Sequence, residues 1–170
     1  GYRTIGIQRN GNLFPQFGFA RGFDVYETSE DAIGELTTND AIASLKNVAA
    51  PFFLYVHYMD PHLPYEPPDS YRSLFGYRPE TLAEEERPIV EHFKDYYFGY
   101  CKYITNQIQE MPFKELSPEG KEAVKLLYDA LIRYTDDQVA RLVAHVQQHH
   151  PKTVFFIIAD HGEHFWDHGR

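Results

Sequence analysis

The stretch TVFFIIADHGEH, residues 153–164, carries the strongest fold signal in this sequence. Its apolar run ends abruptly at Asp160, His161 and Gly162. A short apolar run that stops at polar residues is typical of a buried strand in a parallel sheet. In open α/β sheets, ligands bind outside the carboxyl ends of the strands, which is where this Asp-His pair would lie. A carboxylate beside an imidazole is suited to bind a divalent metal ion.

A second segment, PFFLYVHYMDPHLPY at residues 51–65, repeats the arrangement. Its apolar run predicts a buried strand over 52–58, and the strand is followed by Asp60 and His62. Prolines stiffen the loop that holds His62, so this side chain could hydrogen-bond a substrate or protonate a leaving group. His57 lies inside the run, which favours a hydrogen-bonded core histidine. Two strands that end in titratable side chains predict one shared active site.

Other interpretations of these residues stay open. Asp160 could cap a following helix, with Gly162 forming the turn. His161, His164 and His168 are three and four residues apart, so a helix would place them on one face as a zinc site. The glycine after His161 favours a loop, which would break that stacking.

The remaining pattern is that of a layered α/β fold. Asp136 and Asp137 belong to a long helix and are expected to be solvated or salt-bridged. In the segment over 81–116 the apolar residues show no clear helical or strand periodicity, and a helix is expected over 91–109. In chain order, the sequence predicts a strand over 2–7, an ordered Gly/Phe-rich loop over 10–24 and a helix over 41–48 that is capped from 37–40. The strand over 52–58 and a proline-rich loop over 61–80 follow. A helix from Ser117 to about His149 and a strand from Thr153 complete the order.

Composition excludes several classes of function. A net charge of −9 argues against a nucleic-acid-binding protein. Cys101 is the single cysteine, so no internal disulfide can form. No apolar run approaches membrane-spanning length, and no phosphate-binding loop, dinucleotide-binding glycine motif or Gly-x-Ser-x-Gly elbow occurs. The chain begins without Met in a strand-like pattern, as expected for the middle of a longer protein, and nothing in it predicts a compartment.

Taken in order, five segments resemble the sulfatase family of the alkaline phosphatase superfamily. The resemblance implies a partial α/β/α sandwich around a mainly parallel sheet, and residues 1–170 as one partial catalytic domain. Residues 76–116 lie outside it and are expected to be a variable insertion. The matching segments are GYRT at 1–4, GFARGFD at 18–24, PFFLYVHYMDPHLPY at 51–65, YDALIRYTDD at 128–137 and residues 153–169.

The resemblance also implies roles for individual residues. Asp160 and His161 resemble the late pair of ligands to one divalent metal ion, with Ca²⁺ expected first and Mg²⁺, Mn²⁺ or Zn²⁺ as alternatives. His62 resembles the histidine that contacts the sulfate group or the leaving oxygen. The family's nucleophile, a Cys or Ser converted to formylglycine, is expected upstream of this chain together with the early acidic ligands. Cys101 does not match that motif.

The function implied by this resemblance is hydrolysis of a small-molecule or saccharide sulfate ester, with the isolated segment inactive. Many sulfatases have Asp-Asn where this chain has Asp160 and His161, and the His variant occurs in branches that also handle phosphoryl groups. A phosphodiesterase, phosphonate hydrolase or phosphotransferase therefore stays an alternative. A non-catalytic binding module is a third possibility, against which the presence of His62, Asp160 and His161 argues.

Overall fold

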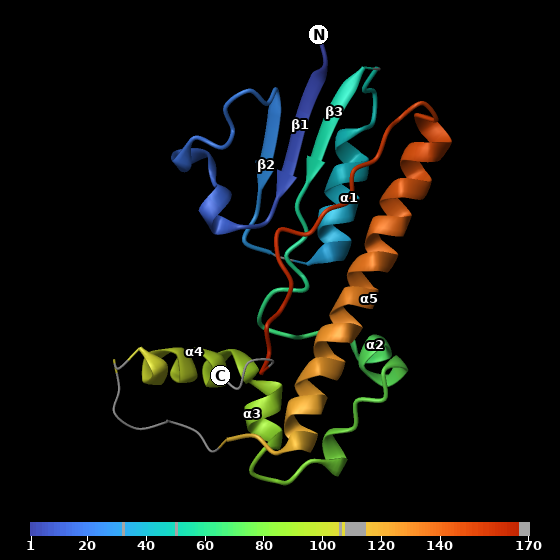
Figure 1. The fold of residues 1–170 in the computed structure, drawn as a ribbon. Helices are drawn as coiled ribbons and strands as arrows, with labels where there is room; N and C mark the ends of the chain where they lie inside the picture. Colours follow the sequence, from blue (N-terminus) through green and yellow to red (C-terminus); the bar gives the residue numbers. More distant parts are fainter. Residues whose placement is uncertain (32, 50, 106, 108–114, 167–170) are drawn as a thin grey trace.

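The chain folds around a small parallel sheet of three strands, in the order β2-β1-β3 (Figure 1). The strands are β1 (Arg3–Gln8), β2 (Val25–Thr28) and β3 (Phe52–Val56). This sheet and its covering helices confirm the predicted α/β class with parallel strands. The computed structural model describes residues 1–31, 33–49, 51–105, 107 and 115–166.

β1 is the central strand because its alternate residues are small or apolar. Ile5 pairs with Val25 on one side and with Leu54 on the other, and its own side chain is buried. Gly6 faces the opposite side of the sheet, where a Cβ atom would lie 2.5 Å from the ring of Tyr26. The strand β2 was not predicted, although the residues VYET are good β-formers.

Two helices cover one face of this sheet (Figure 1). They are α1 (Gly34–Ser44) and the carboxyl half of α5 (Pro118–His149). Together with the sheet they bury a set of apolar side chains that we call the sheet-side core: Ile5, Ile7, Ala41, Leu45, Leu142 and Val146.

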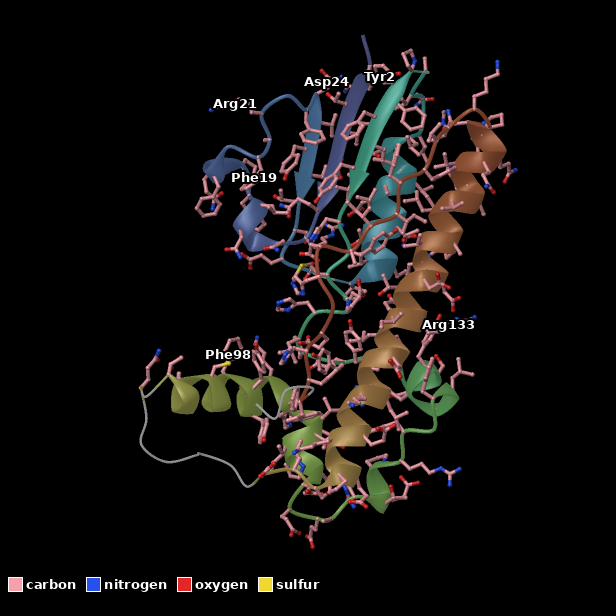
Figure 2. All side chains as sticks on the ribbon, viewed as in Figure 1. Tyr2, Phe19, Arg21, Asp24, Phe98 and Arg133 are labelled. Atoms are coloured by element: carbon pink, nitrogen blue, oxygen red, sulfur yellow. The ribbon has the colours of Figure 1, made fainter. Side chains whose placement is uncertain are left out.

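The loop before β2 lies against the other face of the sheet. The ring of Phe23 lies 5.1 Å from that of Tyr26 and 6.1 Å from that of Phe53, measured between ring centroids. Phe17 and Phe19 are 61% and 49% exposed, and Figure 2 shows Phe19 on the outer part of this loop. Of these three aromatic side chains, Phe23 packs against the sheet, and Phe17 and Phe19 are exposed.

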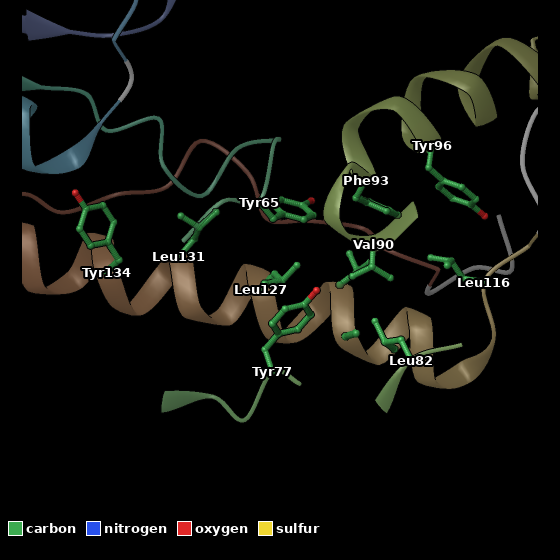
Figure 3. Packing of buried hydrophobic residues seen from close by; sticks show 12 residues of the cluster. Tyr65, Tyr77, Leu82, Val90, Phe93, Tyr96, Leu116, Leu127, Leu131 and Tyr134 are labelled. Atoms are coloured by element: carbon green, nitrogen blue, oxygen red, sulfur yellow. The ribbon is translucent and has the colours of Figure 1, made fainter. Parts of the chain in front are cut away.

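The amino half of α5 is surrounded by short helices. They are α2 (Asp69–Leu74), α3 (Arg87–Glu91) and α4 (Phe93–Ile104), with a single 3-10 turn at Pro79–Thr81, whereas the 3-10 turns at Gly11–Leu13 and Pro15–Phe17 lie in the loop before β2. Helix was therefore correctly expected after residue 91, and the proline-rich loop contains a helical turn that was not. These elements bury a second set of side chains, which we call the aromatic core and which Figure 3 shows: Tyr65, Tyr77, Leu82, Val90, Phe93, Tyr96, Leu116, Ala123, Val124, Leu127, Leu131 and Tyr134.

Helix α5 begins and ends as predicted. The Ser117 hydroxyl accepts a hydrogen bond from the backbone N–H of Gly120 at 3.1 Å, and Pro118 occupies the first turn. In the middle of the helix Tyr134 and Gln138 are buried, whereas Ile132 is 43% exposed. No helix in the described part of the chain is long and apolar enough to span a membrane.

The start of α1 corrects the predicted capping residues. The helix begins at Gly34, so residues 37–40 lie inside it rather than before it. No side chain next to the helix caps it. Instead, Asp60 Oδ1 accepts from Gly34 N at 2.7 Å and the Tyr134 hydroxyl accepts from Glu35 N at 2.9 Å. A cap supplied from two remote segments leaves no local sequence signal.

The predicted buried strand from Thr153 is also corrected. The segment over 153–159 forms no strand pair, and Val154, Phe156 and Ile158 are 75%, 88% and 90% exposed. Its composition is that of a buried strand, but a strand is stable only beside a partner, and the described residues provide none.

Candidate active site

Asp160 lies close enough to the end of β3 for its charge to act on His57, although no strand forms directly before it. Asp160 and His161 are exposed, with Asp160 Oδ2 3.8 Å from His161 Nε2. Asp160 Oδ1 accepts from the backbone N–H of His161 at 3.0 Å, which keeps the carboxylate turned toward its neighbour. The two side chains therefore present an oxygen and a nitrogen to the same volume of solvent.

Hydrogen bonds set the charge of both groups. The N–H of His161 is the main cause of a lowered pKa of Asp160, so this carboxylate is ionised at neutral pH. His161 Nδ1 lies 2.8 Å from the carbonyl oxygen of Gly162, which can only accept, so Nδ1 carries the proton and Nε2 has the free lone pair. This bond, and then the charge of Asp160, raises the pKa of His161. A proton therefore competes with any metal for Nε2.

This donor pair fits a divalent metal ion. Donor atoms 3.8 Å apart can both reach one ion at bond lengths of about 2.0–2.6 Å. A backbone carbonyl on the second ring nitrogen is the usual partner of a metal-bound histidine. Two protein ligands are too few for a complete shell, and the described residues contain no group of three or more acidic, His or Cys side chains that could hold an ion. Further ligands would have to come from other parts of the protein.

His62 is oriented in the same way as His161. It is exposed on the loop after β3, and its backbone N–H donates to Met59 O at 2.8 Å. Its Nδ1 donates to the carbonyl of Leu63 at 2.8 Å, which leaves Nε2 for a ligand or a substrate. The loop thus fixes both the position and the tautomer of this side chain.

One hydrogen bond joins the two loops that carry these residues. The Tyr65 hydroxyl donates to Glu163 Oε2 at 2.5 Å, and burial together with this bond raises the pKa of Tyr65 far above its usual range. The Tyr65 ring stacks on Phe93 at 5.8 Å, inside the aromatic core. Phe165 packs against Tyr128 at 5.2 Å, which anchors the second loop to the same core. Neither Tyr65 nor Glu163 was singled out as a site residue, although both lie in the quoted segments, because no local pattern relates two residues so far apart in sequence.

Asp60 and His57 play parts that differ from the sequence prediction. Asp60 is buried beneath α1, so it positions the helix and does not face the site. His57 Nδ1 is buried without a hydrogen-bond partner among the described residues, so the expected hydrogen-bonded core histidine is wrong. Burial lowers the pKa of His57, and the nearby charge of Asp160 opposes this. In the sequence, the position of His57 at the end of an apolar run was the sign that its imidazole would be buried.

The other titratable side chains do not join the site. Residues 161–164 are not helical, so His161 and His164 lack the stacking that a three-histidine zinc site requires, and His168 lies outside the described residues. On α5, Asp137 Oδ1 lies 3.1 Å from Arg133 Nε, which confirms the expected salt bridge.

Comparison with known proteins assigns the family. A sequence model of the sulfatase family matches residues 2–169, nearly the whole chain. The chain belongs to the sulfatase family. Among curated proteins, human iduronate 2-sulfatase is 26% identical over 157 residues, which are 86% of this chain and 28% of that protein. No solved structure matches significantly. This sulfatase chain therefore spans little more than a quarter of the relative that it resembles.

Proposed function

We propose that this chain is part of the catalytic domain of a metal-dependent hydrolase of sulfate esters. The observation that supports the proposal is the Asp160–His161 pair, 3.8 Å apart with Nε2 free, near the carboxyl end of β3 in a sulfatase-family chain. The named relative is a sulfatase of iduronate, which favours a saccharide or other small-molecule sulfate ester as substrate.

The proposed roles follow from the geometry. Asp160 and His161 hold one divalent ion, Ca²⁺ before Mg²⁺, Mn²⁺ or Zn²⁺, with the remaining ligands outside this chain. A bound ion there would offset negative charge on the transferred group. When its imidazole carries a second proton, on Nε2, His62 donates a hydrogen bond or that proton to the leaving oxygen. The nucleophile, a formylglycine, also lies outside this chain, so the 170 residues alone are inactive.

The metal assignment is tested in the protein of natural length. Asp160→Ala should lower sulfate release from 4-nitrophenyl sulfate by about 100-fold or more, the scale of losing one charge-stabilising group. It should also weaken Ca²⁺ binding measured by calorimetry. Asp136→Ala, on the outer face of α5, is the control and should change neither. Unchanged turnover and Ca²⁺ affinity in Asp160→Ala would reject the assignment.

His62 is tested by comparing leaving groups. If it donates a proton, His62→Gln should slow hydrolysis of an alkyl or saccharide sulfate by about 100-fold or more, and that of 4-nitrophenyl sulfate far less, because nitrophenolate leaves without a proton. Equal losses with both substrates would instead assign it to sulfate binding. Faster turnover of phosphate esters than of sulfate esters would favour the phosphoryl-transfer alternative.

A further inference from the structure

Two histidines lie side by side on the last turns of helix α5. His145 and His149 are four residues apart, and residues at this spacing are neighbours on the surface of a helix. Their rings are stacked, with the centroids 4.3 Å apart and an angle of 29° between the ring planes. His149 is exposed and His145 is partly buried. Both imidazoles can therefore be reached from solvent, and both can reach the same small ligand.

A hydrogen bond determines which nitrogen of His149 is free. His149 Nδ1 lies 2.9 Å from the backbone carbonyl oxygen of His145, which can only accept, so Nδ1 carries the proton and Nε2 keeps its lone pair. A backbone carbonyl on the second ring nitrogen is the usual partner of a metal-bound histidine. The ring of His145 forms no hydrogen bond within the described residues, so either of its nitrogens can act as a ligand.

The end of the helix favours a positive ligand at the same place. Helix α5 has 32 residues and ends at His149, so its last carbonyl groups form the negative end of the helix dipole. Cations are stabilised there, and the effect acts within the last turn of a helix. An ion bound to both His145 and His149 would lie beside that turn. The two ligand nitrogens and the helix dipole therefore attract a cation together.

This histidine pair lies at the opposite edge of the sheet from the candidate active site. The ring of His150, the residue after α5, lies 5.0 Å from that of Phe52, the first residue of β3. Asp160 instead acts on His57, which follows the last residue of β3. Figure 1 shows the carboxyl end of α5 beside the start of β3. The pair is therefore separate from the residues proposed to act on the sulfate ester.

We propose that His145 and His149 together bind one transition-metal ion of the Zn²⁺, Ni²⁺ and Cu²⁺ class. Imidazole nitrogen suits these ions, whereas Ca²⁺ and Mg²⁺ prefer oxygen ligands. Small rotations of the two exposed rings bring both nitrogens to bond lengths of about 2.0–2.1 Å. Water fills the other positions, because the described residues contain no group of three such ligands. The bound ion stabilises the folded helix end, since an unfolded chain does not hold two imidazoles at this spacing.

Calorimetric titration of the natural-length protein with Ni²⁺ tests the proposal, with Asp160→Ala as the starting protein so that the other proposed site lacks a ligand. Adding His145→Gln or His149→Gln should weaken Ni²⁺ binding by about 10-fold or more, at least the cost of losing an outer hydrogen-bond partner of a metal ligand. The control is His92→Gln, which removes an exposed imidazole elsewhere and should change nothing. Equal affinities in the His149→Gln and His92→Gln proteins would overturn the proposal. Without Asp160→Ala, His149→Gln should leave sulfate release unchanged, so the two proposals fail separately.

Melting curves give an independent measurement, because an ion that binds only the folded state raises the melting temperature. Ni²⁺ at about 100 times its dissociation constant should raise that of the Asp160→Ala protein by about 3 °C or more. The increase should persist after His92→Gln and disappear after His149→Gln, each variant being compared with its own metal-free sample. An increase of the same size in the His149→Gln protein would place the ion elsewhere and contradict the proposed site.

Discussion

Helix α5 joins two hydrophobic clusters that differ in how fully they are closed. Around its amino half, every member of the aromatic core is at most 7% exposed, including the large rings of Tyr65 and Phe93. Around its carboxyl half, the sheet-side core buries Ile5 and Ile7, yet the neighbouring segment over 153–159 leaves its apolar side chains in solvent. One helix thus connects a closed half and an open half.

The difference follows from how far apart in sequence the contacting residues are. The aromatic core is built from residues 65–134, and short helices there satisfy their own backbone before they pack. A parallel sheet instead needs partner strands from distant parts of the sequence. The helical half is therefore completed by residues that are close in sequence, whereas the sheet half depends on residues that are far apart.

The largest expected effect is the loss of packing in the closed half. Leu127→Ala removes a side chain that is 2% exposed in the aromatic core and should lower the free energy of unfolding by about 2–5 kcal/mol. The matched control is Ile132→Ala on the outer face of the same helix, which should cost less than about 1 kcal/mol. Urea unfolding measures both. Similar losses in the two variants would show that this half is not closed.

A smaller effect is expected where the candidate site is fastened to the closed half. Tyr65→Phe keeps the ring in the aromatic core and removes only the hydrogen bond to Glu163, a loss of about 1.5–3 kcal/mol for a bond to a charged group. Tyr128→Phe is the control, because its hydroxyl has no hydrogen-bond partner in the described structure. Urea unfolding and Ca²⁺ titration of the natural-length protein measure the two consequences. If the two variants behave alike, the hydrogen bond between Tyr65 and Glu163 does not couple the candidate site to the aromatic core.

The sequence was most informative where a local pattern decides the structure. Ser117 and Pro118 predicted the start of α5, and the apolar run over 52–58 predicted β3, because caps and strand composition act over a few residues. Asp160, His161 and His62 could be named because each follows an apolar run and matches a family motif. The structure orients each imidazole with a backbone carbonyl, but their roles in catalysis and metal binding stay predictions, as does the variable insertion over 76–116.

Long-range contacts decided the rest. No local pattern relates Asp60 to Gly34 or Tyr65 to Glu163, because these pairs are 26 and 98 residues apart. The prediction of a buried strand from Thr153 was wrong for a related reason, since composition predicts a strand but does not predict that a partner strand lies beside it. In the Gly/Phe-rich loop, hydrophobicity alone does not say that Phe23 faces the sheet while Phe17 and Phe19 are exposed.

A third effect concerns the remote cap that links β3 to α1. Asp60→Ala should lower the free energy of unfolding by about 0.5–2 kcal/mol, since Gly34 N loses its acceptor. Burial raises the pKa of Asp60, so the folded state binds its proton more tightly than the unfolded state does. This contribution to stability is fully present below about pH 4 and is lost as the pH rises through the raised pKa. Asp60→Asn cannot ionise, so urea unfolding between pH 4 and 8 should show a less negative slope for this variant, and parallel curves would contradict the assignment.

The smallest effect should occur at the surface between the two halves. Arg133 Nε pairs with Asp137 on the solvent side of α5, and Arg133→Gln should change the free energy of unfolding by less than about 0.5 kcal/mol. On the buried side, Tyr134 accepts from Glu35 N, and Tyr134→Phe should cost about 1 kcal/mol because that N–H loses its partner. A larger loss in Arg133→Gln than in Tyr134→Phe would mean that surface charges, and not the buried contacts of α1 with α5, hold the open half to the closed one.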